Sequence, residues 1–345
     1  MKIVKTISVM AAAAAVVAMT LTGCTQRSSG DNPGASASTG NGGGEVSVAF
    51  VPKLQGIPYF EAMNTGGQKA AKDLGFTWLY QGPTSADAAA QADIVRSFIQ
   101  QKVGVLFVAP NDPNSMAPVL KQAQDAGIHI ATADTDAPDS ARELFVNQAT
   151  AEGLGQTLTD QLMKAMGDKG EYAIVSCGET AENLNSWIAV QKKYTAEKYP
   201  NAKIVDIVYA GEDQAKATQM ATDLMNAHPN LTGLVGECTS SAPGVAQAVK
   251  DAGKIGKVFT VGLGTPQAMK PYLDSGASSA SVLWDVEALG YLTGWAGVQL
   301  AKGAEIPAKP DVPGAPDATY DASSKVLLLG PPLVITKDNA GNYNY

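Results

Sequence analysis

The chain has 345 residues, of which 45% are hydrophobic and 17% are charged, and its formal net charge is −8. A chain of this length and composition can bury a sizeable core, and two domains are expected rather than one. No stretch is rich in lysine and arginine, which argues against nucleic acid as a partner.

The first 23 residues have the pattern of a bacterial lipoprotein signal peptide. Lys2 and Lys5 form a short basic region, and an alanine-rich apolar run extends from residue 7 to residue 21, just before Cys24. The run is too short for an ordinary membrane-spanning helix, so we expect cleavage before Cys24 and attachment of acyl chains, palmitate among them, to this residue. Several acyl chains would anchor the protein to the outside of the cell membrane. A retained signal anchor is the alternative.

Residues 24–45 are dominated by Ser, Gly, Asn, Ala and Pro, and we expect a flexible tether. Loss of the signal peptide removes two lysines, which leaves 23 basic and 33 acidic residues and a formal charge of −10. Outside Cys24 the cysteines are Cys177 and Cys238, and no Cys/His spacing indicates zinc. We expect no metal and no cofactor.

From residue 46 onward the chain repeats a unit of strand, loop and helix. Apolar runs predict strands at residues 48–51, 103–109, 129–133, 144–147, 172–176, 203–208, 233–237, 258–262 and 281–284. Helical periodicity follows at residues 60–74, 87–102, 116–123, 187–198, 215–227, 245–252 and 286–301. A further apolar run covers residues 325–335.

This alternation predicts an α/β fold with parallel, helix-covered sheets and right-handed crossovers. Because two such runs follow one another, we expect two Rossmann-like, doubly wound lobes. The pieces after residue 280 are assigned most economically to crossings between the lobes, which gives a three-segment hinge. The expected boundaries are residues 46–147 plus 285–323 for lobe 1, and 148–284 plus 324–345 for lobe 2.

Polar and aromatic side chains gather where predicted strands end, which is where ligands bind in open α/β sheets. After the first strand come Lys53, Tyr59 and Phe60, a hydrogen-bond donor and two flat rings that suit a small polyhydroxylated molecule. The alternative is that the two aromatic residues only pack the first helix onto the sheet. Further candidates of this kind are Asp134, Asp136, Asn183, Asn185, Glu237, Thr239, Thr265, Trp284 and Asp285.

Several of these candidates also have an interpretation in which they only stabilise the fold. Asp134 would cap a turn, Asn183 or Asn185 would cap a helix, Trp284 would be core between the lobes, and Glu237 would be solvated. If they do face a ligand, burying them costs about 1–3 kcal/mol each unless the ligand pairs them. This cost is how a closed cleft discriminates between ligands.

Catalysis is poorly supported, and we do not expect an enzyme. The chain has two histidines, one inside a predicted strand, and contains neither a Gly-x-Ser-x-Gly nor a His-Glu-x-x-His motif. Asp134 and Asp136 would suit acid–base work, but no nucleophile or cofactor loop accompanies them. The glycine-rich segment at residues 261–266 lacks the third glycine of a dinucleotide loop.

Several stretches together resemble the type I periplasmic solute-binding proteins of ABC sugar importers, in the branch of the autoinducer-2-binding and rhamnose-binding proteins. They are Phe50-Val-Pro-Lys53-Leu, Gln81-Gly-Pro-Thr84, Thr132-Ala-Asp134-Thr-Asp136, Val146-Asn147-Gln148, Met269-Lys-Pro271-Tyr272 and Leu283-Trp-Asp285-Val. The resemblance implies two lobes, a hinge, capture of a ligand in the cleft and delivery to the permease subunits of an ABC transporter, with the binding protein as a monomer.

The resemblance also bears on the ligand. The lysine and the first aspartate of the autoinducer-2 site fall on Lys53 and Asp134. The Asp-Gln pair of that site falls on Asn183-Leu184, and its Pro-Asp-Ala segment falls near Glu237-Cys238-Thr239. Because half of these contacts are altered, we expect a neutral monosaccharide or polyol, with a rhamnose-like sugar favoured. Binding of autoinducer-2 for uptake or as a signalling co-receptor is the main alternative, and a structural lipoprotein is another.

The strand order predicts one covalent link. In a 2-1-3 order, the first and third strands of the second lobe are neighbours. Cys177 ends the first of these strands and Cys238 ends the third, in a compartment where disulfides persist. We therefore expect their Cα atoms to lie within ~7 Å of each other, close enough for a disulfide. Two separate buried thiols are the alternative.

Overall fold

The computed structural model describes residues 46–345. The predicted signal peptide, the acylated Cys24 and the tether lie outside the described residues. Within residues 46–345 no helix combines the length and the apolar character needed to cross a membrane.

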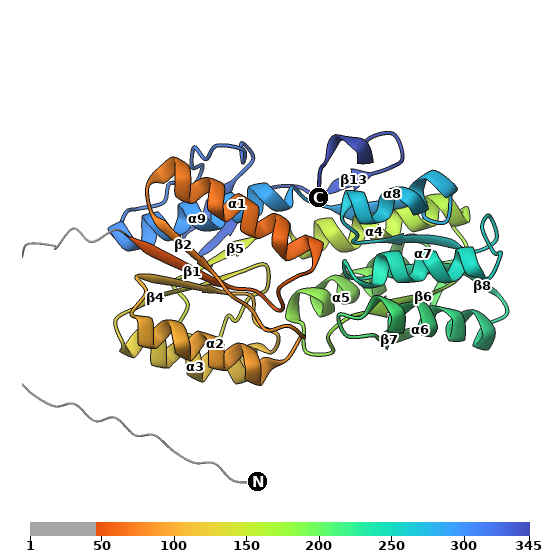
Figure 1. Cartoon of the computed structure of the whole chain (residues 1–345). Coiled ribbons are helices and arrows are strands. Elements are labelled where there is room, and N and C mark those ends of the chain that lie inside the picture. Colours follow the sequence, from red (N-terminus) through yellow and green to blue (C-terminus); the bar gives the residue numbers. More distant parts are fainter. Residues whose placement is uncertain (1–45) are drawn as a thin grey trace, which may run out of the picture. The chain divides into compact units, whose positions relative to one another are not determined.

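Two mainly parallel β-sheets with helices on both faces make up this part of the chain (Figure 1). The first sheet has the order β11-β12-β5-β4-β3-β1-β2. Its strands are β1 (Ser47–Val51), β2 (Thr77–Tyr80), β3 (Val105–Val108), β4 (His129–Ala133), β5 (Leu144–Asn147), β11 (Thr319–Asp321) and β12 (Val326–Leu328). Helices α1 (Pro58–Leu74) and α9 (Val286–Lys302) cover one face, and α2 (Ala88–Gln101) and α3 (Pro113–Asp125) cover the other.

The central strands show why both faces are covered. Val48 and Phe50 of β1 join the core under α1 and α9, whereas Ala49 and Val51 join the core under α2 and α3. Successive side chains of a strand point to opposite faces, so a strand that is apolar throughout must be buried on both sides.

The second sheet has the order β13-β10-β9-β8-β6-β7. Its strands are β6 (Gly170–Ser176), β7 (Ala202–Tyr209), β8 (Leu231–Gly236), β9 (Phe259–Gly262), β10 (Ala280–Leu283) and β13 (Leu333–Ile335). Helices α4 (Ala151–Met166) and α5 (Glu182–Lys198) cover one face, and α6 (Gln214–Ala227) and α7 (Ser241–Asp251) cover the other. Helix α8 (Pro266–Ser275) packs beside α7 and β10, and a short 3₁₀ turn occupies Ala340–Asn342.

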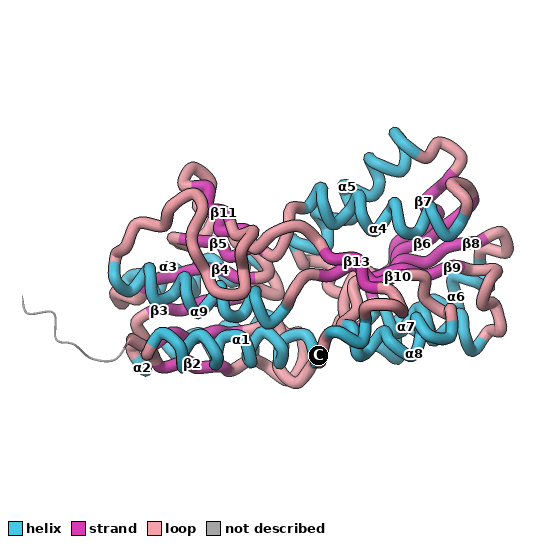
Figure 2. The backbone as a smooth tube through the Cα atoms, turned by 90° about the horizontal axis from the view of Figure 1, so that it is seen from above, coloured by secondary structure: helices cyan, strands magenta, loops and turns pink. Residues whose placement is uncertain are grey.

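The chain passes between the sheets after β5, after β10 and after β12, so the predicted two-lobed α/β fold with three crossings is confirmed. The expected boundary at residue 323 is wrong for the last crossing, because β12 pairs in parallel with β5 of the first sheet. The apolar run at residues 325–335 is not one element, since Gly330, Pro331 and Pro332 divide it. Beyond them, β13 lies beside β10 in the second sheet (Figure 2).

Strands β2 and β11 and helix α4 were missed, and helix α5 begins earlier than predicted. Strand β2 lies half-buried at the edge of the first sheet, and its Thr-Trp-Leu-Tyr sequence, which is rich in strand-forming residues, would have revealed it. Helix α4 carries Leu154, Leu158 and Leu162 at helical spacing, and this pattern would have revealed it. Helix α5 starts at Glu182, five residues before the first turn that periodicity suggested.

Helices α1 and α9 touch through their backbones. A Cβ atom on Gly66 would lie 1.9 Å from the carbonyl oxygen of Glu287, and one on Gly290 would lie 1.9 Å from that of Met63. No other residue fits at either position without moving a helix. Since α1 starts one residue before Tyr59 and α9 starts two residues after Trp284, this packing fixes two aromatic side chains relative to each other.

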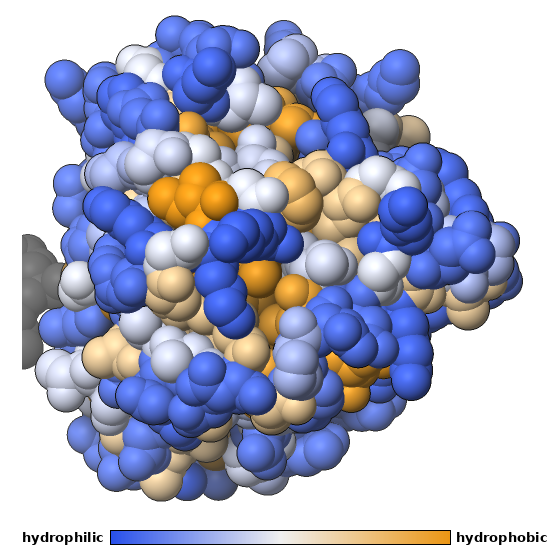
Figure 3. Space-filling model, turned by 90° about the vertical axis from the view of Figure 1, so that its right-hand side faces the viewer, coloured by the Kyte–Doolittle hydropathy of each residue, from blue (hydrophilic) through white to orange (hydrophobic). Residues whose placement is uncertain are grey.

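Nearly all large apolar side chains are used in the cores. Leu74 and Ile255 are the large hydrophobic residues that the described chain leaves exposed. The end of the second lobe seen in Figure 3 is accordingly mostly hydrophilic, with apolar atoms confined to small areas between polar side chains.

Candidate functional site

The loop after β1 carries the first cluster of site residues. The strand ends before Pro52, and α1 begins with Pro58 in its first turn, so the intervening loop leaves the carboxyl edge of the sheet. Lys53 in this loop is 5% exposed, although it carries an ammonium group. Its Nζ atom donates a hydrogen bond of 3.0 Å to Oδ1 of Asn183 in the second lobe, and lies 3.8 Å from Oδ2 of Asp134. A buried charge of this kind requires such partners.

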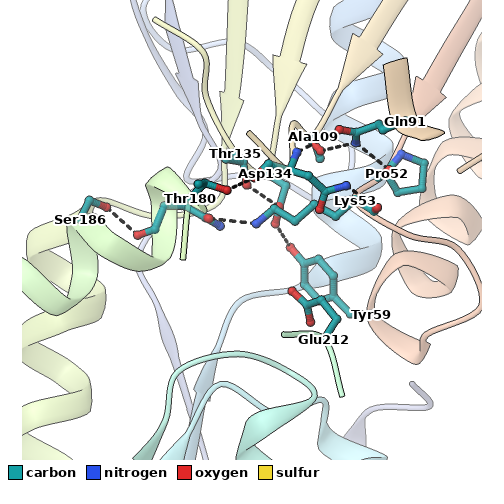
Figure 4. Close-up of polar contacts among 12 residues, drawn as sticks. Pro52, Lys53, Tyr59, Gln91, Ala109, Asp134, Thr135, Thr180, Ser186 and Glu212 are labelled. Carbon is teal, nitrogen blue, oxygen red and sulfur yellow. Dashed lines mark hydrogen bonds and ion pairs between the residues drawn. The ribbon is translucent and has the colours of Figure 1, made fainter. Parts of the chain in front are cut away.

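Asp134 follows β4 and is the anionic partner of Lys53. Its φ of 68° places it in the left-handed region, which is uncommon for a residue other than glycine. The Tyr59 hydroxyl donates to its Oδ1 atom at 2.6 Å, and the Thr135 hydroxyl donates to Oδ2 at 3.0 Å. Burial, and then the negative charge of Asp134, raise the pKa of Tyr59 well above its ordinary value, so this phenol remains a donor. Figure 4 shows Lys53, Tyr59 and Asp134 converging, with Glu212 beside Tyr59.

These residues line a cavity between the two lobes. Its wall is formed by Lys53, Ile57, Tyr59, Phe60, Asp134, Asn183, Leu184, Trp187, Glu212, Cys238, Thr239, Leu263 and Trp284. The mixture of apolar walls and a few convergent polar groups is typical of small-molecule sites.

Four aromatic rings form much of the apolar part of this wall, together with Ile57, Leu184 and Leu263. Trp284 meets Tyr59 edge-on at a centroid distance of 5.8 Å and meets Trp187 at 5.9 Å. Tyr59 in turn packs edge-on against Phe60 at 5.0 Å. Within residues 46–345 the indole Nε1 atom of Trp284 is buried and has no hydrogen-bond partner. A ligand in this cavity would find ring faces for its apolar side and an unused donor.

Glu212 belongs to the site, and sequence reasoning missed it. It stands three residues beyond the end of β7, after Gly211 turns the backbone at a φ of 68°. Its Oε2 atom accepts a hydrogen bond of 3.1 Å from the Ser240 hydroxyl. Burial raises the pKa of Glu212, and the nearby Lys53 ammonium partly opposes this shift. The available signal was a carboxylate closely following a strand of the second lobe.

Several predicted residues lie outside this cavity. Asp136 instead forms a buried ion pair with Arg142, whose Nε atom is 2.6 Å from Oδ1 and whose Nη2 atom is 2.8 Å from Oδ2. Asn185 donates to the carbonyl of Glu179, and Asp285 caps α9 by accepting from the backbone N–H of Ala288. Thr265 lines a neighbouring cavity.

Glu237 also turns away from the cavity, and it is buried rather than solvated. Both of its carboxylate oxygens accept from the Gln191 amide, at 2.7 and 2.8 Å. Burial raises the pKa of Glu237 to about 8, because the charged form loses its hydration. The side chain is therefore a titratable group inside the second lobe, beneath the end of β8.

Cys177 and Cys238 are joined by a disulfide, with their Cα atoms 6.1 Å apart, inside the predicted limit. Strands β6 and β8, which precede them, are neighbours in the order β8-β6-β7, as expected. The Glu212 carboxylate lies within 4.8 Å of both sulfur atoms. This group does not suit a metal ion, because sulfurs bonded to each other offer no thiolate ligands.

Comparison with known proteins places this geometry in a family. The sequence profile of the periplasmic binding protein domain matches residues 48–305. The D-ribose/D-allose-binding protein of Pseudomonas aeruginosa is 30% identical over 241 residues, which are 66% of this chain and 74% of that protein.

Similar solved structures support the same family assignment. LsrB from Clostridium saccharobutylicum in complex with AI-2 has a TM-score of 0.81 and 29% identity, and covers 87% of this chain and 100% of that one. A solute-binding protein of an ABC transporter from Clostridium phytofermentas with bound L-rhamnose has a TM-score of 0.81 and 27% identity, and covers 87% and 98%. The resemblance noted in the sequence is thus confirmed, and the chain belongs to the periplasmic binding protein family.

Proposed function

We propose that this protein captures a small neutral sugar or polyol, with a rhamnose-like monosaccharide favoured, between its two lobes and delivers it to an ABC permease. The observation that carries the proposal is the cavity, in which four aromatic rings face Lys53, Asp134 and Asn183. Hydroxyl groups both donate and accept, so they can pair with an ammonium, a carboxylate and an amide at once. The rings suit the apolar face of a sugar or the methyl group of a deoxysugar.

Contacts across the cavity support lobe closure as the mechanism. Lys53 of the first lobe donates to Asn183 of the second, and the Thr180 hydroxyl of the second lobe donates to the Asn111 carbonyl of the first at 3.0 Å. The Asn111 amide also holds the Lys53 carbonyl at 2.8 Å, which ties the two contacts together. A sugar that pairs with Lys53 and Asn183 gains only where both lobes meet it, and this differential affinity shifts the balance toward the closed form.

The place of the protein in the cell is part of the same proposal. Acyl chains on Cys24 would hold it outside the cytoplasm, and a monomer with a tether would reach the permease from there. The acid–base pair that an enzyme would need from Asp134 and Asp136 is not assembled in the cavity, since Asp136 pairs with Arg142.

Binding of autoinducer-2 is the second candidate, because one similar structure holds AI-2 and because Lys53 and Asp134 line the cavity. Against it, Leu184 also lines the cavity, where the resembling site has a hydrogen-bonding amide. A buried polar group of the ligand would be left unpaired there, which costs about 1–3 kcal/mol.

A thermal-shift screen tests the proposal, with L-rhamnose, D-ribose, D-allose, D-arabinose, common polyols and AI-2 as ligands. A ligand at a hundredfold excess over its Kd stabilises the folded state by about 2.7 kcal/mol, so a clear rise in Tm is expected for one sugar or polyol. Asn183→Ala should abolish the rise, whereas the matched control Asn185→Ala, on the same helix but outside the cavity, should keep it. A rise with AI-2 alone would favour the second candidate, and no rise with any compound would contradict both.

A further inference from the structure

A second cavity adjoins the first. It shares Ile57, Tyr59, Glu212 and Thr239 with the wall of the first cavity. The first-lobe segment 57–59 forms one side, and the starts of α7 and α8 in the second lobe form the other. Because the two cavities share lining residues from both lobes, a substituent of a ligand in the first cavity that points past Glu212 would lie next to the second.

The polar groups of the second cavity have unused hydrogen-bonding capacity. Thr265 is 1% exposed and lines this cavity, and among the described residues its hydroxyl has no hydrogen-bond partner. Thr265 precedes α8 at the capping position, yet its side chain does not cap the helix. A buried hydroxyl without a partner is costly, and a ligand hydroxyl would relieve that cost.

The charge of the second cavity indicates which chemical class of ligand it can bind. Glu212 is the acidic residue in its wall, beside the neutral side chains of Gln214, Ser240 and Thr265. A carboxylate repels phosphate, sulfate and acidic sugars, whereas it accepts hydrogen bonds from neutral hydroxyls. Pro58, Pro243 and Ala268 supply an apolar surface on which a sugar ring can pack.

From these observations we infer that the second cavity is a subsite for a neutral hydroxylated substituent, so that the preferred ligand is an O-glycoside or a short oligosaccharide. One ring occupies the first cavity, the glycosidic bond passes Glu212, and the second residue pairs with Thr265. This inference rests on the proposed function, since it assigns the ring in the first cavity to a sugar.

Isothermal titration of the full chain tests the subsite with matched probes. L-rhamnose, D-ribose and D-arabinose are each compared with their methyl glycosides and with disaccharides in which the same ring is linked to glucose. For the ring that binds, the disaccharide is expected to bind at least about 10-fold more tightly than the free sugar, because it pairs the Thr265 hydroxyl and covers the apolar wall.

Variants distinguish the contributions of the two cavities to binding. Thr265→Val should weaken the disaccharide about 5- to 10-fold, and Ala268→Phe, which fills the second cavity, should weaken it more, while both leave the free sugar within about 3-fold. Asn183→Ala should weaken both ligands. The subsite is overturned if the disaccharide binds no better than the free sugar, or if neither Thr265→Val nor Ala268→Phe changes its affinity. Either result leaves the proposed function standing. If no sugar of either kind binds, both fall together.

Discussion

The strand ends of the two lobes meet at the same cavity, but they do different things there. In the first lobe, β1 and β4 are followed by Lys53 and Asp134, whose opposite charges lie 3.8 Å apart in the cavity wall. In the second lobe, β6 is followed by Cys177 and β8 by Glu237 and Cys238. The two cysteines form a disulfide, and the Glu237 carboxylate is buried away from the cavity against Gln191. Both lobes obey the rule that ligands bind at the carboxyl ends of parallel strands.

This difference assigns separate tasks to the lobes. The first lobe offers charged groups whose present partners a sugar can replace. The second lobe holds its strand ends together covalently and presents an amide, Asn183, and a half-buried carboxylate, Glu212. Charged contacts in the first lobe should therefore control affinity, whereas the strand ends of the second lobe should control stability.

The largest expected effect is on stability and comes from reduction of the disulfide. Cys177 and Cys238 are 61 residues apart in sequence, and closing a loop of that length is worth about 4 kcal/mol in the chain-entropy account. Dithiothreitol should lower the free energy of unfolding of the wild type by that order. The variant with Cys177→Ser and Cys238→Ser should be equally destabilised and should not respond to the reductant. Two free thiols in the untreated protein would contradict this assignment.

A loss of affinity of about 100-fold is expected for Asp134→Ala. The change removes a carboxylate that lines the cavity and would accept hydrogen bonds from the sugar, and losing a charged contact to a bound partner costs about 2–5 kcal/mol. Titration calorimetry with the sugar found in the screen measures it. Asp136→Ala is the matched control two residues away, because it breaks the pair with Arg142 and should lower stability with little effect on affinity. Equal losses of affinity in both variants would remove the distinction between the two aspartates.

Glu237 should make stability fall as the pH rises. Its folded-state pKa is about 8, above the ordinary value of 4.5, so the folded state holds a proton that the unfolded chain releases. The stabilisation is complete below pH 4.5 and is lost as the pH rises through about 8. Between pH 5 and pH 8 the wild type should lose on the order of 3 kcal/mol relative to Glu237→Gln, which cannot ionise. Parallel stability curves for the two proteins, from urea unfolding, would contradict the buried, protonated state.

The smallest expected effect is at the contact between Thr180 and Asn111. Thr180→Val removes one exposed hydrogen bond between the lobes, so sugar affinity should fall about 2- to 3-fold. Thr222→Val is the control, since the Thr222 hydroxyl bonds within α6 of the second lobe and should not affect closure. A stronger effect of the control than of Thr180→Val would show that this contact does not contribute to closure.

The alternation of elements and the positions of Lys53, Tyr59, Asp134, Asn183 and Trp284 could be predicted from the sequence, because apolar periodicity locates the strands and their ends locate the cleft. The direction in which a side chain points after the end of a strand could not be predicted from the sequence. Asp134 and Asp136 stand two residues apart, but the left-handed backbone at Asp134 sends one into the cavity, and the other meets Arg142.

The positions of the Glu212 and Glu237 side chains could not be predicted for the same reason. Glu237 directly follows β8, and its side chain enters the interior, where Gln191, 46 residues away in sequence, receives it. Glu212 follows a glycine turn beyond β7 and reaches the cavity. These outcomes depend on long-range partners and on turn conformation, neither of which hydrophobic patterning reports.

The most direct test of the central claim is a tryptophan fluorescence titration, because Trp187 and Trp284 both line the cavity. Titrating the protein with the sugars and polyols of the screen should give, for at least one of them, a saturable change with one site per chain that Asp134→Ala weakens about 100-fold. A flat response to every sugar and polyol, from protein that unfolds cooperatively, would contradict the claim that the cavity between the lobes is a sugar site.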